Sequence, residues 1–301
     1  MSQTISCTLG LYEVYLIANK PNGKCTDVKL QTDIQPIPHT INYCWFGGSP
    51  LGKKELACIE SWKRYLPGYE IRRWDETNFD FRCCDYVSEA YDAKKWAFVS
   101  DYARFEILYE HGGLYFDTDV ELIKPIDDIL ERGPFMGFET DWVNDADGAV
   151  APGLGLAANP GLGLYNAILA SYKNNHFVKP DGTLDETTIV TRATRVLLQH
   201  GLESRAGIQE VEGVWLYPSE YFNPKDFKTG KIHITDNTRS IHHFSMSWLT
   251  PEQIFQNRII NHLTARGMSE ATAGHISGFL TTLRYLDFGR VVKHFKWSKN
   301  G

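Results

Sequence analysis

The hydrophobic positions of this chain change period along its length. In residues 37–48 (IPHTINYCWFGG), apolar side chains occupy alternate positions as far as Trp45 and two glycines follow, which predicts a buried strand that ends in a turn. A helical pattern starts at about Lys53, and a Pro-Gly turn then leads into a short apolar strand that ends at Trp74-Asp75. This order of strand, helix and strand predicts an α/β fold.

Residues 100–120, SDYARFEILYEHGGLYFDTDV, predict the end of a helix, a glycine stop and a strand that ends in carboxylates. The apolar residues of the helix recur at roughly helical spacing, at Val99, Tyr102, Ala103 and Ile107. Gly112 or Gly113 is expected to end the helix, because glycine tolerates the backbone conformation found at helix C-termini. The apolar strand that follows runs into Asp117-Thr118-Asp119.

Two carboxylates at the end of an apolar strand indicate a bound cation. Neighbouring carboxylates repel each other and lose solvation when they are partly buried, so a fold seldom places them there unless a cation neutralises them. Oxygen ligands suit Mg²⁺ or Mn²⁺, and such an ion needs few protein ligands when diphosphate oxygens complete its shell. The pattern therefore favours a nucleotide-diphosphate ligand over the common alternative, a loop with two solvated aspartates.

Asp101, Arg104 and Trp45 each have an ordinary explanation when taken alone. Asp101 and Arg104 lie three residues apart on one helix face, where an exposed ion pair contributes only about a few tenths of a kcal/mol. A tryptophan in a strand is usually part of the core. Trp45, however, is expected at the carboxyl end of a parallel strand, where open α/β sheets bind ligands.

Residues 241–249, IHHFSMSWL, contain adjacent histidines followed by Ser-Trp. In a strand, His243, Ser245 and Ser247 share one face, while His242 and Phe244 point the other way. Adjacent histidines are usually structural, but this pair lies far along the chain from the two aspartates. We therefore expect His243 to be a metal ligand that reaches the site from a separate segment.

Together these segments resemble the DxD glycosyltransferases of family 32, the capsular-polysaccharide type, and their relatives the large clostridial glucosylating toxins. The resemblance spans roughly residues 36–249 and rests on WFGG, on HHFSMSW and on Asp101, Arg104, Tyr115, Asp117 and Asp119 in the family's spacing. It implies a GT-A type fold, that is, a Rossmann-like mixed sheet, over residues 36–250. Residues 1–35 would then be an N-terminal extension, with a hairpin turn at Asn22-Gly23, and residues 251–301 a C-terminal helical segment.

The resemblance also implies the roles of the site residues. Asp101, Arg104 and Asp117 are expected to be catalytic, and Asp117, Asp119 and His243 to hold Mn²⁺ or Mg²⁺. The nucleotide sugar is expected to contact Trp45, Phe46, Asp101, Arg104, Tyr115, Asp117, Thr118, Ser247 and Trp248. In this family the tryptophan that matches Trp45 stacks on the base, and Ser247-Trp248 would lie on a segment that closes over the diphosphate.

We therefore expect a metal-dependent transferase that moves a hexose or N-acetylhexosamine from a nucleotide sugar to a glycan acceptor. A UDP-sugar is the preferred donor, and GDP-mannose is the second choice. The family implies retention of the anomeric configuration and a role in surface-polysaccharide synthesis, of capsule or O-antigen. One alternative is a haloacid-dehalogenase-like phosphatase with Asp117 as nucleophile, but that fold places its DxD after the first strand. The other is a non-catalytic sugar-binding module, which would need no Arg104 beside the metal.

The composition is that of an ordinary enzyme. The chain has 301 residues, 43% of them hydrophobic, which is enough for one large domain with additions. Its net charge of -6 argues against bulk nucleic-acid binding. All six cysteines lie in the first 84 residues without a CxxC pair, which indicates reduced thiols. The N-terminal residues lack the features of a secretory signal, so we expect a cytoplasmic location.

The last fifty residues read as helical from Pro251, with breaks near Gly267 and Gly278. From Arg284 to the end, the basic residues exceed the single aspartate by four, and aromatic residues recur at spacings of three and four. A basic, aromatic helix of this kind can lie on an anionic membrane surface. This predicts a peripheral contact at the inner membrane face and a lipid-linked acceptor, and the equal alternative is a terminal helix that packs on the domain.

Overall fold

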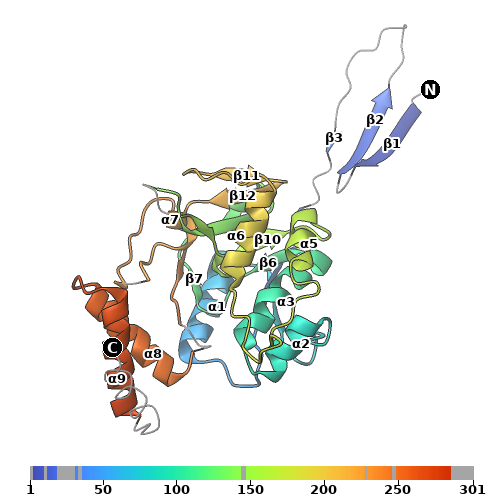
Figure 1. The fold of residues 1–301 in the computed structure, drawn as a ribbon. Helices are drawn as coiled ribbons and strands as arrows, with labels where there is room; N and C mark the ends of the chain where they lie inside the picture. Colours follow the sequence, from blue (N-terminus) through green and yellow to red (C-terminus); the bar gives the residue numbers. More distant parts are fainter. Residues whose placement is uncertain are drawn as a thin grey trace.

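An eight-stranded mixed sheet forms the centre of the molecule (Figure 1). Its strands follow the order β11-β12-β8-β10-β6-β4-β5, and β9 pairs with β8. β4 pairs in parallel with β5 and β6, and β12 with β8, while β9, β10 and β11 pair antiparallel. The strands are β4 (Thr40–Cys44), β5 (Glu70–Trp74), β6 (Gly113–Tyr115), β8 (Phe135–Thr140), β9 (Ala149–Val150), β10 (Leu156–Ala158), β11 (Gln209–Val211) and β12 (Val214–Tyr217). The predicted α/β class with a Rossmann-like mixed sheet is confirmed.

The computed structural model describes residues 3–9, 12–18, 31–32, 36–143, 147–227, 229–245 and 249–285, with side chains from residue 36 onward. The first three of these ranges are mainly β-structure: β1 (Gln3–Leu9), β2 (Tyr12–Ala18) and β3 (Gln31–Thr32) form a sheet of their own. Leu9 pairs with Tyr12, so the hairpin turn falls between these two residues. β2 and β3 also pair antiparallel, and Asn22-Gly23 lie in the connection between them, outside the described ranges, so the turn expected there stays a prediction.

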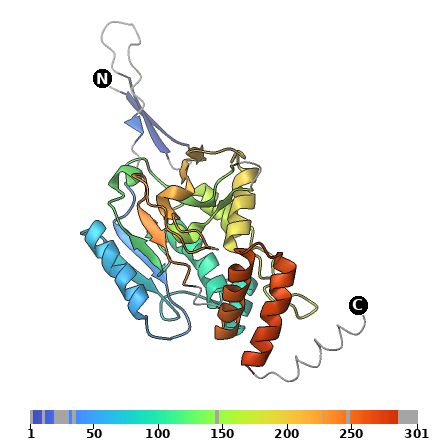
Figure 2. The same ribbon diagram turned by 90° about the vertical axis from the view of Figure 1, so that its left-hand side faces the viewer.

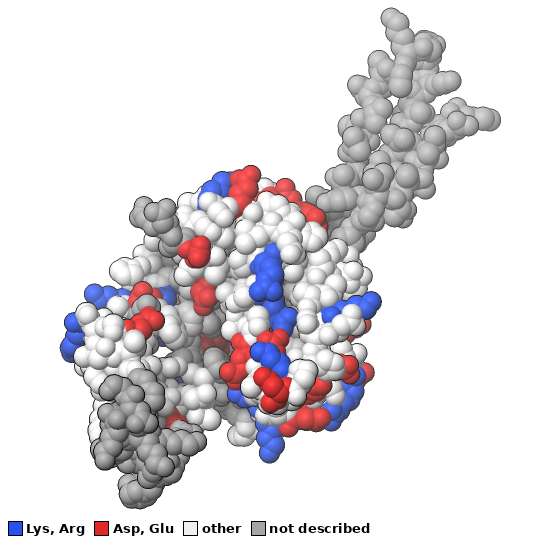
Figure 3. Space-filling model, viewed as in Figure 1, with Lys and Arg blue, Asp and Glu red and all other residues white. Residues whose placement is uncertain are grey.

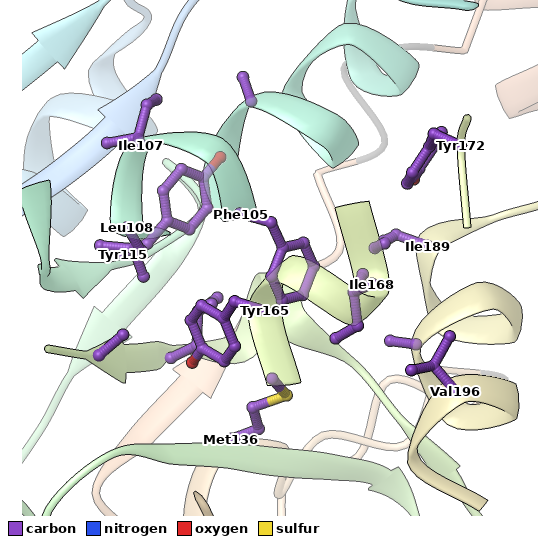
Figure 4. Packing of buried hydrophobic residues seen from close by; sticks show 14 of the residues in the cluster. Phe105, Ile107, Leu108, Tyr115, Met136, Tyr165, Ile168, Tyr172, Ile189 and Val196 are labelled. Atoms are coloured by element: carbon purple, nitrogen blue, oxygen red, sulfur yellow. The ribbon is translucent and has the colours of Figure 1, made fainter. Parts of the chain in front are cut away.

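Helices cover both faces of the main sheet (Figures 1 and 2). One core contains residues from α2 (Asp85–Asp92), α3 (Trp96–His111), α5 (Gly163–Ala170) and α6 (Ile189–Gln199). Figure 4 shows its centre, where Phe105 of α3 packs edge-on against Tyr165 of α5. The second core, on the opposite face, contains residues from α1 (Lys53–Tyr65), α4 (Asp127–Leu130) and α7 (Ser219–Phe222).

Two glycines carry the chain from α3 into β6, as the sequence predicts. Gly112 caps the helix at φ +65° and Gly113 follows at φ +95°. Neither position has room for a side chain, because a Cβ would collide with Pro160 at the first and with the Thr40 carbonyl at the second. This tight crossing delivers the carboxylates after β6 to the edge of the sheet where β4 also ends.

A two-stranded antiparallel sheet joins distant parts of the chain beside the main sheet. β7 (Val120–Leu122) begins directly after the two aspartates and pairs with β13 (Ser240–His242), in a register that sets His242 opposite Val120. The Trp62 side chain of α1 lies fully buried beneath and donates to the Val120 carbonyl. The histidine segment is thereby fixed next to the aspartates.

A helical hairpin follows, formed by α8 (Pro251–Thr264) and α9 (Glu270–Arg284), which lie beside the α/β body in Figure 1. The expected break near Gly267 is confirmed, since this residue lies between the helices at φ +89°. The break expected near Gly278 is wrong, because α9 continues through it and its packing on α8 outweighs the helix-weakening effect of glycine. No helix in the described ranges is long and apolar enough to cross a membrane.

Candidate functional site

Arg104 links two carboxylates at the carboxyl end of the sheet. Its guanidinium lies 2.8 Å from Asp101, one helical turn away on α3, and 3.3 Å from Asp117, which follows β6. The Arg104 side chain is almost fully buried, and its Nε also donates to the Ser100 carbonyl at 3.1 Å. The predicted shared face of Asp101 and Arg104 is therefore present, and it points at the first carboxylate of the Asp-x-Asp motif.

Tyr115 supports Asp117 from inside the core. Its hydroxyl donates to Oδ1 of Asp117 at 3.1 Å, and the Arg104 guanidinium lies 5.0 Å from the centre of its ring. Because Tyr115 is buried, its role in the described structure is to hold the Asp117 carboxylate in place. Burial raises the pKa of Asp117, while the nearby positive charge of Arg104 opposes that rise.

Gly153 forms the floor under Asp117. Its carbonyl accepts the Asp117 main-chain N–H at 3.2 Å. A Cβ on Gly153 would collide with Oδ2 of Asp117 and also crowd Arg104. The sequence shows a Pro-Gly stretch here but gives no sign that it touches the motif.

The N-terminus of α6 meets Asp101 from the other side. The main-chain N–H of Ile189 hydrogen-bonds to the Asp101 carboxylate. Burial raises the pKa of Asp101 to about 6, although Arg104 and this N–H favour the ionised form. Periodicity could not have identified Ile189, because its contribution is a backbone group placed by the helix N-cap at Thr188.

The second carboxylate, Asp119, faces the histidine segment. Its Oδ1 lies 3.1 Å from Nε2 of His242, and its Oδ2 accepts the Ser245 main-chain N–H at 2.7 Å. Burial alone would raise the pKa of Asp119, but these two partners hold it at about 2. For His242, burial alone would lower the pKa, but the hydrogen bond to Asp119 outweighs burial, and the pKa is raised above its ordinary value.

The structure places His242 beside Asp119, whereas His243 was the expected ligand. The His243 ring contacts Glu121 at 2.8 Å, and only its main-chain N–H reaches Asp119, at the carbonyl. Alternation separates the two histidines onto opposite faces but does not say which face meets the aspartates. The pairing of β13 with β7 decides this, together with Phe244, whose φ of +52° turns the chain so that Ser245 also faces Asp119.

The residues present fit a hard divalent ion that takes most of its ligands from phosphate oxygens and water. Asp117 and Asp119 supply carboxylate oxygens, and Nδ1 of His242 is buried without a hydrogen-bond partner. Within the described part of the chain, no three His, Cys, Asp or Glu side chains form a closed metal cluster. Few protein ligands are what Mg²⁺ and Mn²⁺ require when phosphate oxygens and water fill the rest of the shell.

The remaining predicted contacts vary in their placement. Trp45 is half-buried just past β4, and its Nε1 donates to the Ser49 carbonyl at 2.7 Å. Phe46 is buried against Phe79, which leaves its main chain to meet a nucleotide. Thr118 is half-buried between the two aspartates. Ser247 and Trp248 lie outside the described residues.

Comparison with known proteins decides what this arrangement is. Residues 52–136, which include Asp101, Arg104 and the Asp-x-Asp motif, match the model of the glycosyltransferase sugar-binding region containing the DXD motif. These residues are similar to the DXD sugar-binding region of glycosyltransferases. The resemblance seen in the sequence is thus confirmed for this region.

One curated relative is similar to part of this chain. The inositol phosphoceramide mannosyltransferase 1 of Schizosaccharomyces pombe is 27% identical over 134 residues, which cover 38% of this chain and 40% of the relative. This chain therefore matches about two fifths of that protein's length.

Two solved glycosyltransferases are similar to this chain at a low level. The PaToxG glycosyltransferase is 18% identical, with a TM-score of 0.39, over 55% of this chain and 70% of its own. A glycosyltransferase involved in the glycosylation of the major capsid of PBCV-1 is 12% identical, with a TM-score of 0.38, over 69% of this chain and 95% of its own.

Proposed function

We propose that this protein is a metal-dependent glycosyltransferase that moves a hexose or N-acetylhexosamine from a nucleotide sugar to a glycan hydroxyl, with retention of the anomeric configuration. The observation that carries the proposal is the Asp101–Arg104–Asp117 bridge inside the DXD region. A buried arginine held by two carboxylates is a fixed set of donors and acceptors at the end of the sheet. A non-catalytic sugar-binding module has no need of this positive charge.

In the proposed reaction, the bond between the anomeric carbon and the phosphate oxygen breaks, and its electron pair leaves with the nucleoside diphosphate. The acceptor oxygen forms the new bond to the anomeric carbon, and its proton passes to the departing phosphate or to water. Arg104 directs its donors at the sugar hydroxyls or the leaving phosphate, where negative charge develops. Asp101 accepts from sugar hydroxyls, and Tyr115 and Gly153 keep Asp117 in place.

Asp117 and Asp119, with His242 beside them, would hold the divalent ion. A bound Mn²⁺ or Mg²⁺ supplies Lewis-acid stabilisation of the leaving diphosphate. Ser245 contributes by orienting Asp119 through its main-chain N–H. Trp45 is proposed to stack on the base.

The family resemblance supports a UDP-sugar as donor, and the name of the yeast relative, a mannosyltransferase, makes GDP-mannose the second donor to test. We place the reaction in surface-polysaccharide synthesis, of capsule or O-antigen, in the cytoplasm at the inner membrane face. Exposed Phe279 and Leu283 on α9 and exposed Tyr285 just after it, followed by the basic tail, support a peripheral membrane contact and a lipid-linked acceptor. Basic and acidic side chains are intermixed on the face shown in Figure 3, and nucleic acid is not proposed as a partner.

The deciding experiment is hydrolysis of a panel of UDP- and GDP-sugars by the purified protein, with Mn²⁺, with Mg²⁺ and with a chelator. We expect slow release of the nucleoside diphosphate from one donor, abolished by the chelator. Nucleotide binding without turnover on any donor or glycan acceptor would favour the sugar-binding module. Release of phosphate from phosphomonoesters, with no action on nucleotide sugars, would favour the phosphatase.

A further inference from the structure

A cavity opens next to Ser245, which binds Asp119. It has a volume of about 380 Å³ and lies between α1, the segment after β13 and α8. Its lining includes Lys54, Cys58, Lys225, Phe244, Ile254 and Arg258. This volume lies within the range of small-molecule sites, and the mixture of apolar and charged walls is typical of such sites.

The cavity carries excess positive charge in an acidic protein. Three of its side chains are cationic, and Glu121 is its single carboxylate, already engaged by His243 at 2.8 Å. Lys225 donates to the His243 carbonyl at 2.6 Å, which leaves two of its three ammonium hydrogens available. Neither Lys54 nor Arg258 forms an ion pair with any carboxylate in the described part of the chain.

The cavity adjoins Asp119, the second carboxylate of the DXD motif, through Ser245. Ser245 lines the cavity and donates to Asp119, whereas Asp101, Arg104 and Tyr115 gather around Asp117. The sugar-binding side chains and the cationic cavity therefore adjoin different carboxylates. A molecule in the cavity can present a hydroxyl toward the metal site without displacing the groups on Arg104.

We propose that this cavity binds a phosphate group of the acceptor, an inference that rests on the proposed function. Lys54, Lys225 and Arg258 converge on the anion, while Ala57, Phe244 and Ile254 contact the apolar part of the acceptor beside it. The Arg258 guanidinium matches phosphate with paired donors, and the two lysines add point charges. The phosphate belongs either to a lipid headgroup or to a soluble sugar phosphate.

The test uses full-length protein with Mn²⁺ and UDP present, and calorimetry with two pairs of probes. The soluble pair is a hexose phosphate and the uncharged methyl hexoside; the vesicle pair is phosphatidylglycerol and phosphatidylcholine. We expect the anionic member of at least one pair, the hexose phosphate or phosphatidylglycerol, to bind and its uncharged or zwitterionic counterpart not to bind. Binding of the soluble probe alone assigns a sugar phosphate, and binding of vesicles alone assigns a lipid phosphate.

The variants are Lys54→Ala and Arg258→Ala, singly and together, with Lys53→Ala as the matched control one residue outside the lining. Each charge removed should weaken probe binding about tenfold, the effect of losing one charge-assisted hydrogen bond. Arg258→Lys should restore part of the loss, and Lys53→Ala should bind as the unaltered protein does. Circular dichroism and thermal melting check that the double variant remains folded.

Two results would overturn the inference: equal probe binding by the double variant and the control, or no binding of either anionic probe to the unaltered protein. A parallel loss of UDP affinity in the double variant would also overturn it, because the cavity would then hold the donor diphosphate. The proposed function fails separately, if no nucleotide sugar is turned over while the probes still bind with the expected dependence on Lys54 and Arg258.

Discussion

The Nε2 atom of His242 lies 3.1 Å from Oδ1 of Asp119, while the neighbouring His243 ring lies 2.8 Å from Glu121. Substitutions of these two adjacent histidines can therefore be compared directly, because only His242 contacts Asp119 through its ring. We expect His242→Ala to raise the Mn²⁺ concentration needed for half-maximal donor hydrolysis by about 10- to 100-fold, the usual cost of losing a group that binds or orients a metal ligand. His243→Ala should change it much less. The reverse order would restore His243 as the ligand.

Removal of the second DXD carboxylate should abolish turnover. Asp119→Ala leaves His242 and Ser245 without their acceptor and removes an oxygen ligand, so donor hydrolysis should fall to background at any Mn²⁺ concentration. Far-ultraviolet circular dichroism should match the unaltered protein. Full turnover by this variant in the presence of a chelator would contradict metal-dependent catalysis.

Gly153→Ala tests the floor beneath Asp117. The added Cβ overlaps Oδ2 of Asp117, so the carboxylate must move away from Arg104 and Tyr115. We expect a loss of about 100-fold or more in donor hydrolysis, since small misplacements of positioning groups cost this much. The control is Gly163→Ala, where a Cβ meets nothing within 4 Å. Equal activity of both variants would show that Asp117 has no fixed role.

Trp45→Ala tests stacking on the nucleotide base. If the ring stacks, nucleotide binding should weaken by about 1–3 kcal/mol, the range for base–aromatic stacking, with little change in melting temperature because the residue is only half-buried. Calorimetric titration with UDP and GDP measures the first quantity. Unchanged affinity with a lower melting temperature would assign Trp45 to the core.

The raised pKa of Asp101 predicts opposite pH trends for activity and stability. Burial moves this pKa from its ordinary 3.8 to about 6. Below pH 6 the Asp101 carboxyl group is therefore protonated, and its negative charge no longer attracts the Arg104 guanidinium. Activity should therefore fall as the pH drops through 6. In the unfolded chain the group ionises near 3.8, so its contribution to stability decreases as the pH rises from about 4 to 6 and stays lower above that.

Asp101→Asn separates the two effects. The melting temperature of this variant, relative to the unaltered protein, should increase between pH 4 and pH 7, because the amide has no ionisation cost. Its residual activity should lack the fall near pH 6. If the fall persists in Asp101→Asn, another group controls it.

The membrane contact is tested by sedimentation with anionic and neutral vesicles at low and high salt. Arg284 lies 4.4 Å from the centre of the Phe255 ring on α8, so the truncation should begin after Tyr285 to leave the helical hairpin intact. The removed residues carry four lysines and arginines and one aspartate. At about 1 kcal/mol for each basic residue, we expect weak, salt-sensitive binding to anionic vesicles that the truncation reduces. Negligible binding in every condition would leave a soluble acceptor.

The elements that carry the site, and the spacing of its charges within them, follow from local features of the sequence. Helical periodicity places Asp101 and Arg104 on one face of α3, and the adjacent glycines force the helix to end and β6 to begin just before Asp117. These features are local, because they depend on residues a few positions apart and on backbone preferences. The resemblance to DXD glycosyltransferases was visible for the same reason.

The distant groups that complete the site depend on how separate segments pack together in the fold. The pairing of β13 with β7 and the turn at Phe244 bring His242 rather than His243 to Asp119, and the packing of α6 brings the Ile189 N–H to Asp101. The fit of Gly153 under Asp117 likewise depends on the close approach of two separate segments. Such contacts are set by strand register and side-chain packing between segments far apart in the chain, which no local periodicity encodes.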